Sequence, residues 1–285
     1  AGDSDRAAEI LQTALEAFPF SRSRESWLVR LGNIYRNQED WAAAEGAYQE
    51  ALAVDPGSGS AWVGLGWLAY EHEQDLPAAQ QTFERALALD PESGEGQVAL
   101  GRLWSREGQY ERAAEWYRQA FAQKPDELSY GISYARALQD AGQTDQSLAE
   151  YQNLVLRFPE SPAAHYQIAL AYRRAGVGTE AVSAIETALA VSEVPNLTYY
   201  LQAKAIYEEN GLSDKVQSLY QEAQIIFLDI AEAYPAFPEP YLYLARLYEG
   251  FDRPDQALAA FEQAVALDPD NAAALAGLER LQGED

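Results

Sequence analysis

Regularly spaced prolines limit the fold of this chain more than any other feature of its sequence. Eight prolines close segments with helical periodicity, and successive members lie 37, 35, 34, 34, 36, 40 and 34 residues apart: Pro19, Pro56, Pro91, Pro125, Pro159, Pro195, Pro235 and Pro269. Proline ends a helix because it forces the preceding residue out of the helical region. A period near 34 residues therefore predicts an array of similar helical units.

Each interval contains two apolar patterns. In the segment Trp62–Pro91 the first pattern comprises Trp62, Leu65, Gly66 and Ala69, and the second comprises Ala79, Phe83, Ala86 and Leu87. Spacings of three and four place each set on one face of a helix. Small residues let two helix backbones approach, while large ones fill the space between pairs. Polar breaks such as residues 37–40 and 107–109 are expected to turn the chain between antiparallel helices.

These residues resemble the tetratricopeptide repeat family. The family pattern has a bulky residue, Leu, Gly and Tyr in the first helix, and Ala, an aromatic residue, Ala and Pro through the second. Five units match it well, whereas residues 127–160 and 196–236 match it more weakly. The resemblance implies an all-α fold, a superhelical solenoid of antiparallel helix pairs.

We expect a single array over residues 1–285, with about seven units, one half unit and one capping helix. Residues 4–19 match only the second helix of a unit, which suggests that the chain begins inside an array. The full units are predicted at residues 25–57, 58–92, 93–126, 127–160, 161–195, 196–236 and 237–270. Residues 271–282 are predicted to cap the array, with Asn271 at the helix start and Leu275, Leu278 and Leu281 on its apolar face.

One predicted helix is longer than the others. Residues 213–234 fit the second-helix pattern twice, seven residues apart. Seven residues are close to two helical turns, so the added length should preserve the buried face and project the helix beyond its neighbours.

Charge and composition exclude several function classes. The chain has 45 acidic and 20 basic residues, a formal net charge of -25 and no cysteine. Such a field repels nucleic acid and anionic lipid, and the absence of cysteine excludes disulfides and thiolate metal sites. No run approaches the roughly 18 apolar residues of a membrane span. We therefore predict no nucleic-acid partner and no direct membrane insertion.

Candidate catalytic chemistry is sparse. The only histidines, His72 and His165, lie in separate units, and an enzyme needs a convergent set of reactive groups. The acidic run at 268–271 resembles the start of a calcium loop, but Ala273 stands where that loop requires glycine. We predict no catalytic residue, no metal site and no cofactor.

The resemblance implies that the first helices line a concave surface. Five arginines fall on the predicted inward face of three adjacent units: Arg102, Arg106, Arg136, Arg173 and Arg174. Asn33, Trp67, Tyr70 and Tyr166 are predicted on the same surface. Arginine pairs in a forked geometry with carboxylate or phosphate. We therefore predict a groove that binds a peptide or partner protein through an acidic or C-terminal carboxylate group.

Alternatives remain open at this level. The arginines could instead pair with acidic neighbours inside the array. The chain could also be the repeat arm of a larger enzyme or membrane assembly, such as a glycosyltransferase or polysaccharide-assembly protein. A third hypothesis is self-association through an array end or through the long helix at 213–234.

Overall fold

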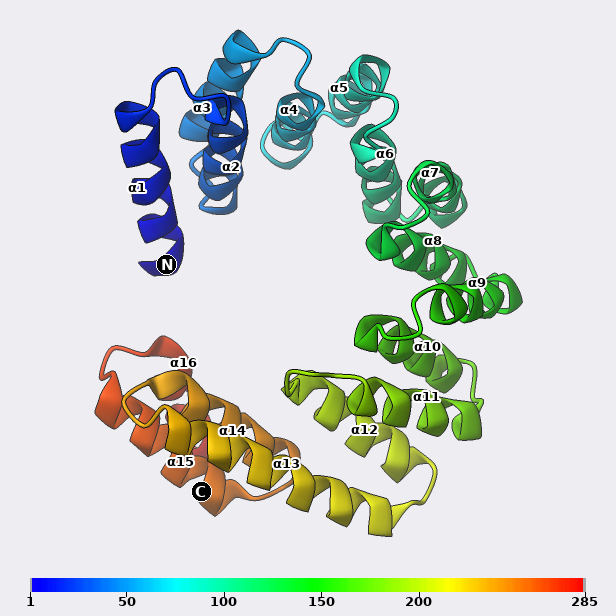
Figure 1. Cartoon of the computed structure of the whole chain (residues 1–285), viewed down its shortest axis with the longest axis vertical. Coiled ribbons are helices and arrows are strands. Elements are labelled where there is room, and N and C mark those ends of the chain that lie inside the picture. The colour runs from blue at the N-terminus through cyan, green and yellow to red at the C-terminus, as the bar shows by residue number, and fades with distance from the viewer. Residues whose placement is uncertain (1, 284–285) are drawn as a thin grey trace. The chain divides into compact units, whose positions relative to one another are not determined.

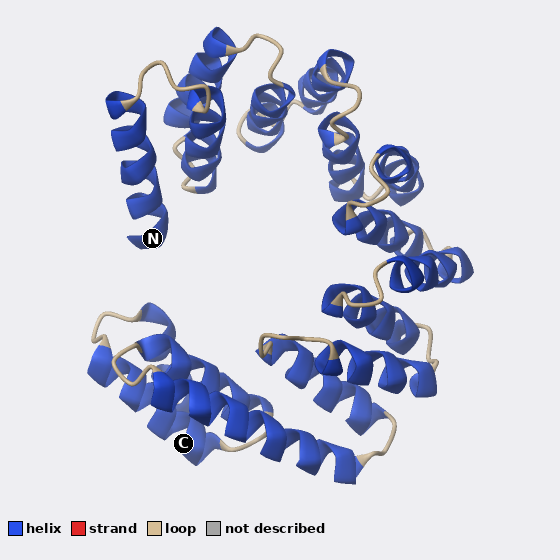
Figure 2. Ribbon diagram, viewed as in Figure 1, coloured by secondary structure: helices blue, strands red, loops and turns tan. Residues whose placement is uncertain are grey.

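The computed structural model describes residues 2–283, which form sixteen α-helices and no strand (Figures 1 and 2). The first helices of successive pairs are α2 (Arg24–Asn37), α4 (Gly59–Glu71), α6 (Glu95–Arg106), α8 (Leu128–Asp140), α10 (Pro162–Arg174), α12 (Leu197–Glu209) and α14 (Pro238–Gly250). The second helices are α3 (Trp41–Val54), α5 (Leu76–Leu89), α7 (Tyr110–Gln123), α9 (Thr144–Arg157), α11 (Gly178–Ala190), α13 (Ser213–Ala233) and α15 (Pro254–Leu267), and α1 (Gly2–Ala17) and α16 (Ala272–Gln282) lie at the ends. The all-α fold is confirmed.

The helices group into two compact units. Unit 1 ends at Glu150 and unit 2 begins at Tyr151, so the boundary lies inside α9. In unit 1 the consecutive helices from α1 to α8 pack on one another along the chain, and in unit 2 those from α10 to α16 do. Neighbouring first helices also touch, as α2 and α4 do. The repeat boundaries stay a prediction. None of the helices within residues 2–283 has the length and apolarity needed to cross a membrane.

Every turn from a first helix to its second helix contains one residue in the left-handed region. Glycine fills this position at Gly108, Gly142, Gly176 and Gly211, whereas Glu39, Gln74 and Asp252 fill it elsewhere, with φ of 61°, 56° and 58°. Because side chains disfavour this conformation, glycine is the least costly residue there. The polar breaks read from the sequence are therefore the turns between antiparallel helices.

The core of unit 1 depends on aromatic rings lying against glycines. Tyr48 on α3 is completely buried, and its ring touches both α2 and α4. A Cβ atom added at Gly32 or Gly64 would lie 2.6 or 2.3 Å from ring atoms of Tyr48. The glycines therefore provide the space that lets one ring fill the interior between two successive helices.

Helix α13 has 21 residues and confirms the predicted long helix of unit 2. Its buried face continues through the added turns, from Leu219 to Ala231. Phe227 lies 6.1 Å from Tyr200 on α12 and 6.2 Å from Tyr243 on α14, measured between ring centroids. The second half of α13 thus packs against α14, so the added turns contribute to packing within unit 2.

The last helix differs in part from the expectation. Asn271 caps α16 as predicted, because its side-chain oxygen accepts a hydrogen bond from the Ala274 backbone at 3.1 Å. Leu275, however, is exposed, and the buried positions are Ala274 and Gly277. A Cβ atom at Gly277 would lie 2.4 Å from the Phe261 ring. Because α15 and α16 approach so closely, the face of α16 with the small residues Ala274 and Gly277 is buried.

Candidate binding hollow in unit 1

The first helices of unit 1 form a hollow of about 340 Å³. It is lined by α2, α4, α6 and one residue of α8: Val29, Asn33, Arg36, Ser60, Val63, Gly64, Trp67, Glu95, Val98, Ala99, Arg102 and Tyr130. Its three valines occupy equivalent positions in successive first helices, 34 and 35 residues apart. This repetition gives the hollow an apolar strip next to its polar groups.

Tyr48 orients the polar side chain of Asn33. The Tyr48 hydroxyl donates a 2.8 Å hydrogen bond to Oδ1 of Asn33. Burial raises the pKa of Tyr48 to about 12, although the Arg36 guanidinium acts in the opposite direction. The hydroxyl is therefore neutral near pH 7 and remains a donor. Because the amide oxygen is taken, Asn33 has its amide nitrogen to offer, and that atom has no hydrogen-bond partner among residues 2–283.

Arg36 leaves a second donor unused. Its side chain is only 15% exposed, and one terminal nitrogen lies 3.2 Å from Oε2 of Glu71. Its Nε atom is buried and has no hydrogen-bond partner in the described part of the chain. A buried donor without an acceptor is costly, and the guanidinium that carries it lines the hollow.

Glu71 is the shared counter-ion of two arginines. Arg36, Glu71 and Arg106 stand at equivalent positions of α2, α4 and α6, each 35 residues from the next. A terminal nitrogen of Arg106 lies 2.7 Å from Oε1 of Glu71, whereas Arg36 contacts the other carboxylate oxygen. The last turns of these three helices therefore carry a positive, negative, positive series that links successive first helices.

Trp67 forms the aromatic base beneath these arginines. Its side chain is only 3% exposed and packs against Tyr70 and Phe83. The guanidinium carbons of Arg102 and Arg106 lie 5.2 and 4.7 Å from the Trp67 ring centroid. Both distances permit cation–π attraction. The Tyr70 hydroxyl donates to Glu107 at 2.8 Å.

Arg102 differs from Arg106 in having no acidic partner. It is exposed, lines the hollow and contacts Trp67, and no carboxylate within residues 2–283 forms an ion pair with it. Arg106, Tyr70 and Arg136 do not line the hollow. The structure therefore brings Asn33, Trp67 and Arg102 together, and it adds Arg36 to them.

Sequence reasoning did not identify every residue of the hollow. Ser60 donates to Glu95 at 2.6 Å, and the Tyr130 hydroxyl reaches the Ser93 carbonyl at 3.5 Å. Ser60, Glu95 and Tyr130 lie in the first turns of their helices, outside the inward positions inferred from the repeat. The first turns of α4, α6 and α8 each contain a polar or aromatic residue near the helix start. This repetition is the sequence signal that could have indicated Ser60, Glu95 and Tyr130.

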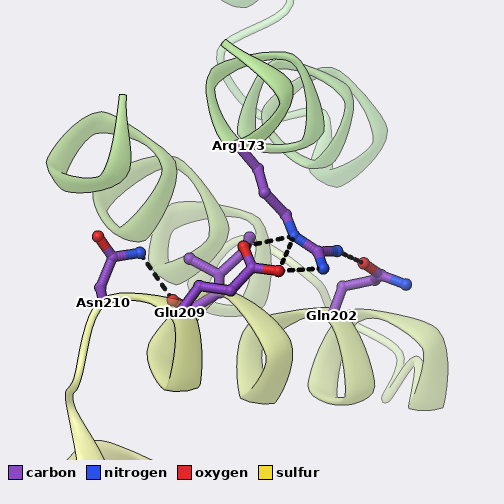
Figure 3. Close-up of polar contacts among 5 residues, drawn as sticks. Arg173, Gln202, Glu209 and Asn210 are labelled. Carbon is purple, nitrogen blue, oxygen red and sulfur yellow. Dashed lines mark hydrogen bonds and ion pairs between the residues drawn. The ribbon is translucent and has the colours of Figure 1, made fainter. Parts of the chain in front are cut away.

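In unit 2, Arg173 is held by neighbours from α12. Its Nε lies 2.8 Å from Oε2 of Glu209, and its Nη1 donates to Gln202 at 3.0 Å (Figure 3). Tyr166 stacks on Tyr199 with ring centroids 4.7 Å apart, and Arg174 lies in the last turn of α10. Arg173 thus links two successive first helices. A groove shared by these residues and the arginines of unit 1 stays a prediction.

The Arg173–Glu209 pair predicts an acid-sensitive contribution to the stability of unit 2. Hydrogen bonds from Arg173 hold the pKa of the Glu209 carboxyl below its ordinary value of 4.5. A lowered pKa in the folded state stabilises the fold above the unfolded-state pKa, and this stabilisation is lost as pH falls through the folded-state value. Because Glu209 is half exposed, we expect less than about 1 kcal/mol.

Urea unfolding from about pH 6 to about pH 3, compared between the wild type and Glu209→Gln, measures this contribution. The wild type should lose more stability than the variant as the solution is acidified. Parallel pH profiles for the two proteins would contradict a folded-state pKa shift at Glu209. The comparison also cancels the general loss of charge repulsion on acidification.

The two histidines have structural contacts. Nε2 of His165 lies 2.8 Å from the Pro159 carbonyl oxygen, and His72 stacks on Trp41 with ring centroids 5.2 Å apart. In the described part of the chain, no group of three or more histidine, aspartate or glutamate residues is arranged to hold a metal ion.

Repeated antiparallel helix pairs, with a hollow formed by their first helices, define a helical-repeat protein. Sequence profiles described as tetratricopeptide repeat match residues 1–160, 135–213 and 238–281. The first match alone covers more than half of the chain. The chain therefore belongs to the tetratricopeptide repeat family, as its sequence pattern indicated.

Solved structures with the same fold are distant in sequence. PilW, described as a widely conserved type IV pilus biogenesis factor, is 20% identical with a TM-score of 0.55, over 72% of this chain and 94% of PilW. A chain of the Cut9–Hcn1 hetero-tetramer of the APC/C is 13% identical with a TM-score of 0.53, over 96% of this chain. The match spans about half, 52%, of that chain. No curated protein matches by sequence. These likenesses concern the fold.

Proposed function

We propose that this protein is a non-catalytic scaffold that binds a peptide segment of a partner protein in the unit 1 hollow. Membership of the tetratricopeptide repeat family supports a protein partner. The observation that carries the proposal is a set of hydrogen-bond donors without acceptors at one hollow: the Arg36 Nε, the Asn33 amide nitrogen and the Arg102 guanidinium. The ligand group that satisfies them is an acceptor with negative charge.

A carboxylate fits these donors best. Two of the three donors belong to guanidinium groups, which form short, charge-assisted hydrogen bonds with carboxylates. The acid already in the hollow, Glu95, accepts from Ser60 and lies in the first turn of α6, whereas Asn33 and Arg36 lie toward the end of α2. An acidic side chain or a C-terminal carboxylate of the partner would therefore enter at the Asn33, Arg36 and Arg102 side.

The apolar strip defines the rest of the ligand. Val29, Val63 and Val98 line the hollow beside the donors, with Trp67 as its base. An apolar side chain next to the ligand carboxylate would be removed from water there, at about 25 cal/mol per Å² of apolar surface. The proposed ligand is thus an extended or helical segment with an apolar residue beside an acidic or terminal carboxylate.

Arg106 and Arg173 have a different role in this proposal. Each already faces a carboxylate of the neighbouring first helix, Glu71 or Glu209. They satisfy acidic neighbours within the array, which is the alternative that the sequence left open for the arginines. Binding is therefore assigned to Arg102, Asn33 and Arg36, because Arg36 lines the hollow although it also pairs with Glu71. Arg106 and Arg173 are assigned to the joining of successive repeats.

Peptide binding by fluorescence anisotropy tests the proposal. A labelled peptide that ends in Val-Val with a free carboxylate should bind the wild type, and its C-terminally amidated twin should bind about tenfold more weakly, because a charged hydrogen bond is lost. Arg102→Gln should weaken binding of the free-carboxylate peptide by a similar factor. The variant should leave binding of the amidated peptide almost unchanged.

Arg118→Gln is the matched control. Arg118 is an exposed arginine on α7 that pairs with Glu115 at 2.7 Å, outside the hollow. Arg118→Gln and Arg102→Gln each remove one positive charge, so general electrostatic attraction to the peptide changes equally in both variants. Equal losses in Arg102→Gln and Arg118→Gln, or equal binding of the two peptides, would contradict carboxylate recognition in the hollow.

A further inference from the structure

A second hollow lies on the opposite face of α4. Its volume is about 350 Å³, with α4 as floor and α3 and α5 as walls, and it is lined by Trp41, Ala42, Glu45, Trp62, Leu65, Leu68, Ala69, His72, Glu73, Ala78 and Thr82. Positions 62, 65, 69 and 72 share one face of the helix, while 60, 63 and 67 face the binding hollow. We call this second hollow the tryptophan trough.

An indole stands at each end of the trough. Trp62 lies near the start of α4, and His72, which stacks on Trp41, lies at its end. Ten residues of α-helix separate positions 62 and 72, so the trough extends for about 15 Å. The floor between the two ends is apolar, formed by Leu65, Leu68 and Ala69. Both indoles are only half buried and contribute to the surface.

The Trp41 end of the trough has uncompensated negative charge. Glu45 and Glu73 line it, and neither forms an ion pair with any residue between 2 and 283. The trough also adjoins the C-terminus of α4, where carbonyl groups carry partial negative charge and the last turn has no basic residue. A cation is therefore favoured at this end.

The Trp62 end already holds a cation of the chain itself. The guanidinium carbon of Arg85 lies 4.1 Å from the Trp62 ring centroid, and the indole nitrogen donates to the Pro56 carbonyl at 3.3 Å. The Trp62 end thus has a cation of its own beside an aromatic ring, whereas the Trp41 end has two acids without an ion-pair partner in the described part of the chain. A complementary ligand has an apolar group for the first end and a positive charge for the second.

In the neighbouring hollow, between α1 and α3, a basic side chain of the protein itself pairs with an acid. Arg24 lines that hollow, donates to the Leu15 carbonyl at 3.0 Å and lies 3.5 Å from the Glu50 carboxylate. A guanidinium from the protein itself therefore compensates an acid of a second helix there. The acids of the tryptophan trough lack such a group.

We propose that the tryptophan trough binds a basic amphipathic helix of a partner protein. A large apolar side chain of that helix lies against Trp62 and Leu65, and a lysine or arginine about three turns away reaches Glu45 and Glu73. The stem of such a basic side chain lies along the apolar floor while its charged head stays near water. The net charge of -25 adds long-range attraction for a basic partner. This site is independent of the proposed carboxylate hollow.

Fluorine NMR of the full chain labelled with 5-fluorotryptophan tests this site. The six tryptophans give six signals, which single Trp→Phe variants assign. The probe is an acetylated and amidated helical peptide with leucine and arginine about three turns apart, and its twin has glutamine for arginine. The basic peptide should shift the Trp41 and Trp62 signals saturably and leave the Trp67 signal in place.

Matched charge variants complete the test. Glu45→Gln/Glu73→Gln should weaken binding of the basic peptide about fivefold, because two exposed ion pairs are lost. Glu84→Gln/Glu92→Gln removes two acids outside the trough and should leave the affinity near the wild-type value. Unshifted Trp41 and Trp62 signals, a shift of Trp67 alone, equal affinity in both double variants, or equal affinity of both peptides would overturn the proposal. Circular dichroism verifies that the variants are equally helical.

Discussion

Replacing Gly64 with valine is expected to destabilise unit 1 by about 3 kcal/mol, because it overpacks a filled core. The new Cβ atom would lie 2.3 Å from the Tyr48 ring, and Gly32 encloses the same ring from α2. The ring cannot move aside without breaking its hydrogen bond to Asn33. Urea unfolding followed by circular dichroism measures the change in the free energy of unfolding.

Gly46→Val is the control for this substitution. Gly46 is an exposed residue of α3, and a Cβ atom added there would meet no neighbouring atom within 4 Å. The same change there should leave stability unchanged or raise it slightly, since glycine is the weaker helix former by a few tenths of a kcal/mol. If both variants were as stable as the wild type, this would contradict the close packing of the Tyr48 ring against Gly64 of α4.

Glu71→Gln is expected to have two opposite effects. Its stability should fall by about 1–2 kcal/mol, less than for a fully buried pair because all three charged groups are partly exposed. Its affinity for the carboxylate-ending peptide should rise about tenfold, because Arg36 loses the acid that competes with the ligand. Anisotropy and urea unfolding measure the two quantities.

The opposite signs separate this mechanism from simple damage to the fold. A merely loosened hollow would bind the peptide more weakly, whereas removal of an internal competitor strengthens binding. Glu209→Gln makes the same change in unit 2, where it should lower stability without affecting peptide affinity in unit 1. An unchanged affinity in Glu71→Gln would show that Arg36 takes no part in ligand binding.

Much of the local structure follows from the sequence. Apolar residues at spacings of three and four define each helix, and prolines and polar breaks define the ends, because these signals act within a few residues. The left-handed turn residues follow the same period, although Glu39, Gln74 and Asp252 show that glycine is favoured there without being required. The tetratricopeptide resemblance then implied which helices lie on which side.

The candidate site was predictable only in part. Asn33, Trp67 and Arg102 were predicted to share one surface, and all three line the same hollow, while their role in binding stays a prediction. Trp67 was predicted on this surface, and the structure shows it almost wholly buried, because Phe83 and the arginines pack against its ring. Arg106 was predicted on the same face as Arg102, but only Arg102 lines the hollow, and only Arg106 has an acid of another helix within reach.

The sequence alone determined where the helices begin and end and, for most of them, which face is apolar, since these depend on periodicity within one repeat; for α16 the buried face differed in part, because Gly277 packs against Phe261. Only the tertiary structure decided which charges are satisfied. Arg36, Glu71 and Arg106 are 35 residues apart along the chain, and the stacking of α2, α4 and α6 brings both guanidinium groups within 3.2 Å or less of the Glu71 carboxylate. Because an ion pair depends on distances of a few ångströms between separate helices, a repeat pattern cannot specify it.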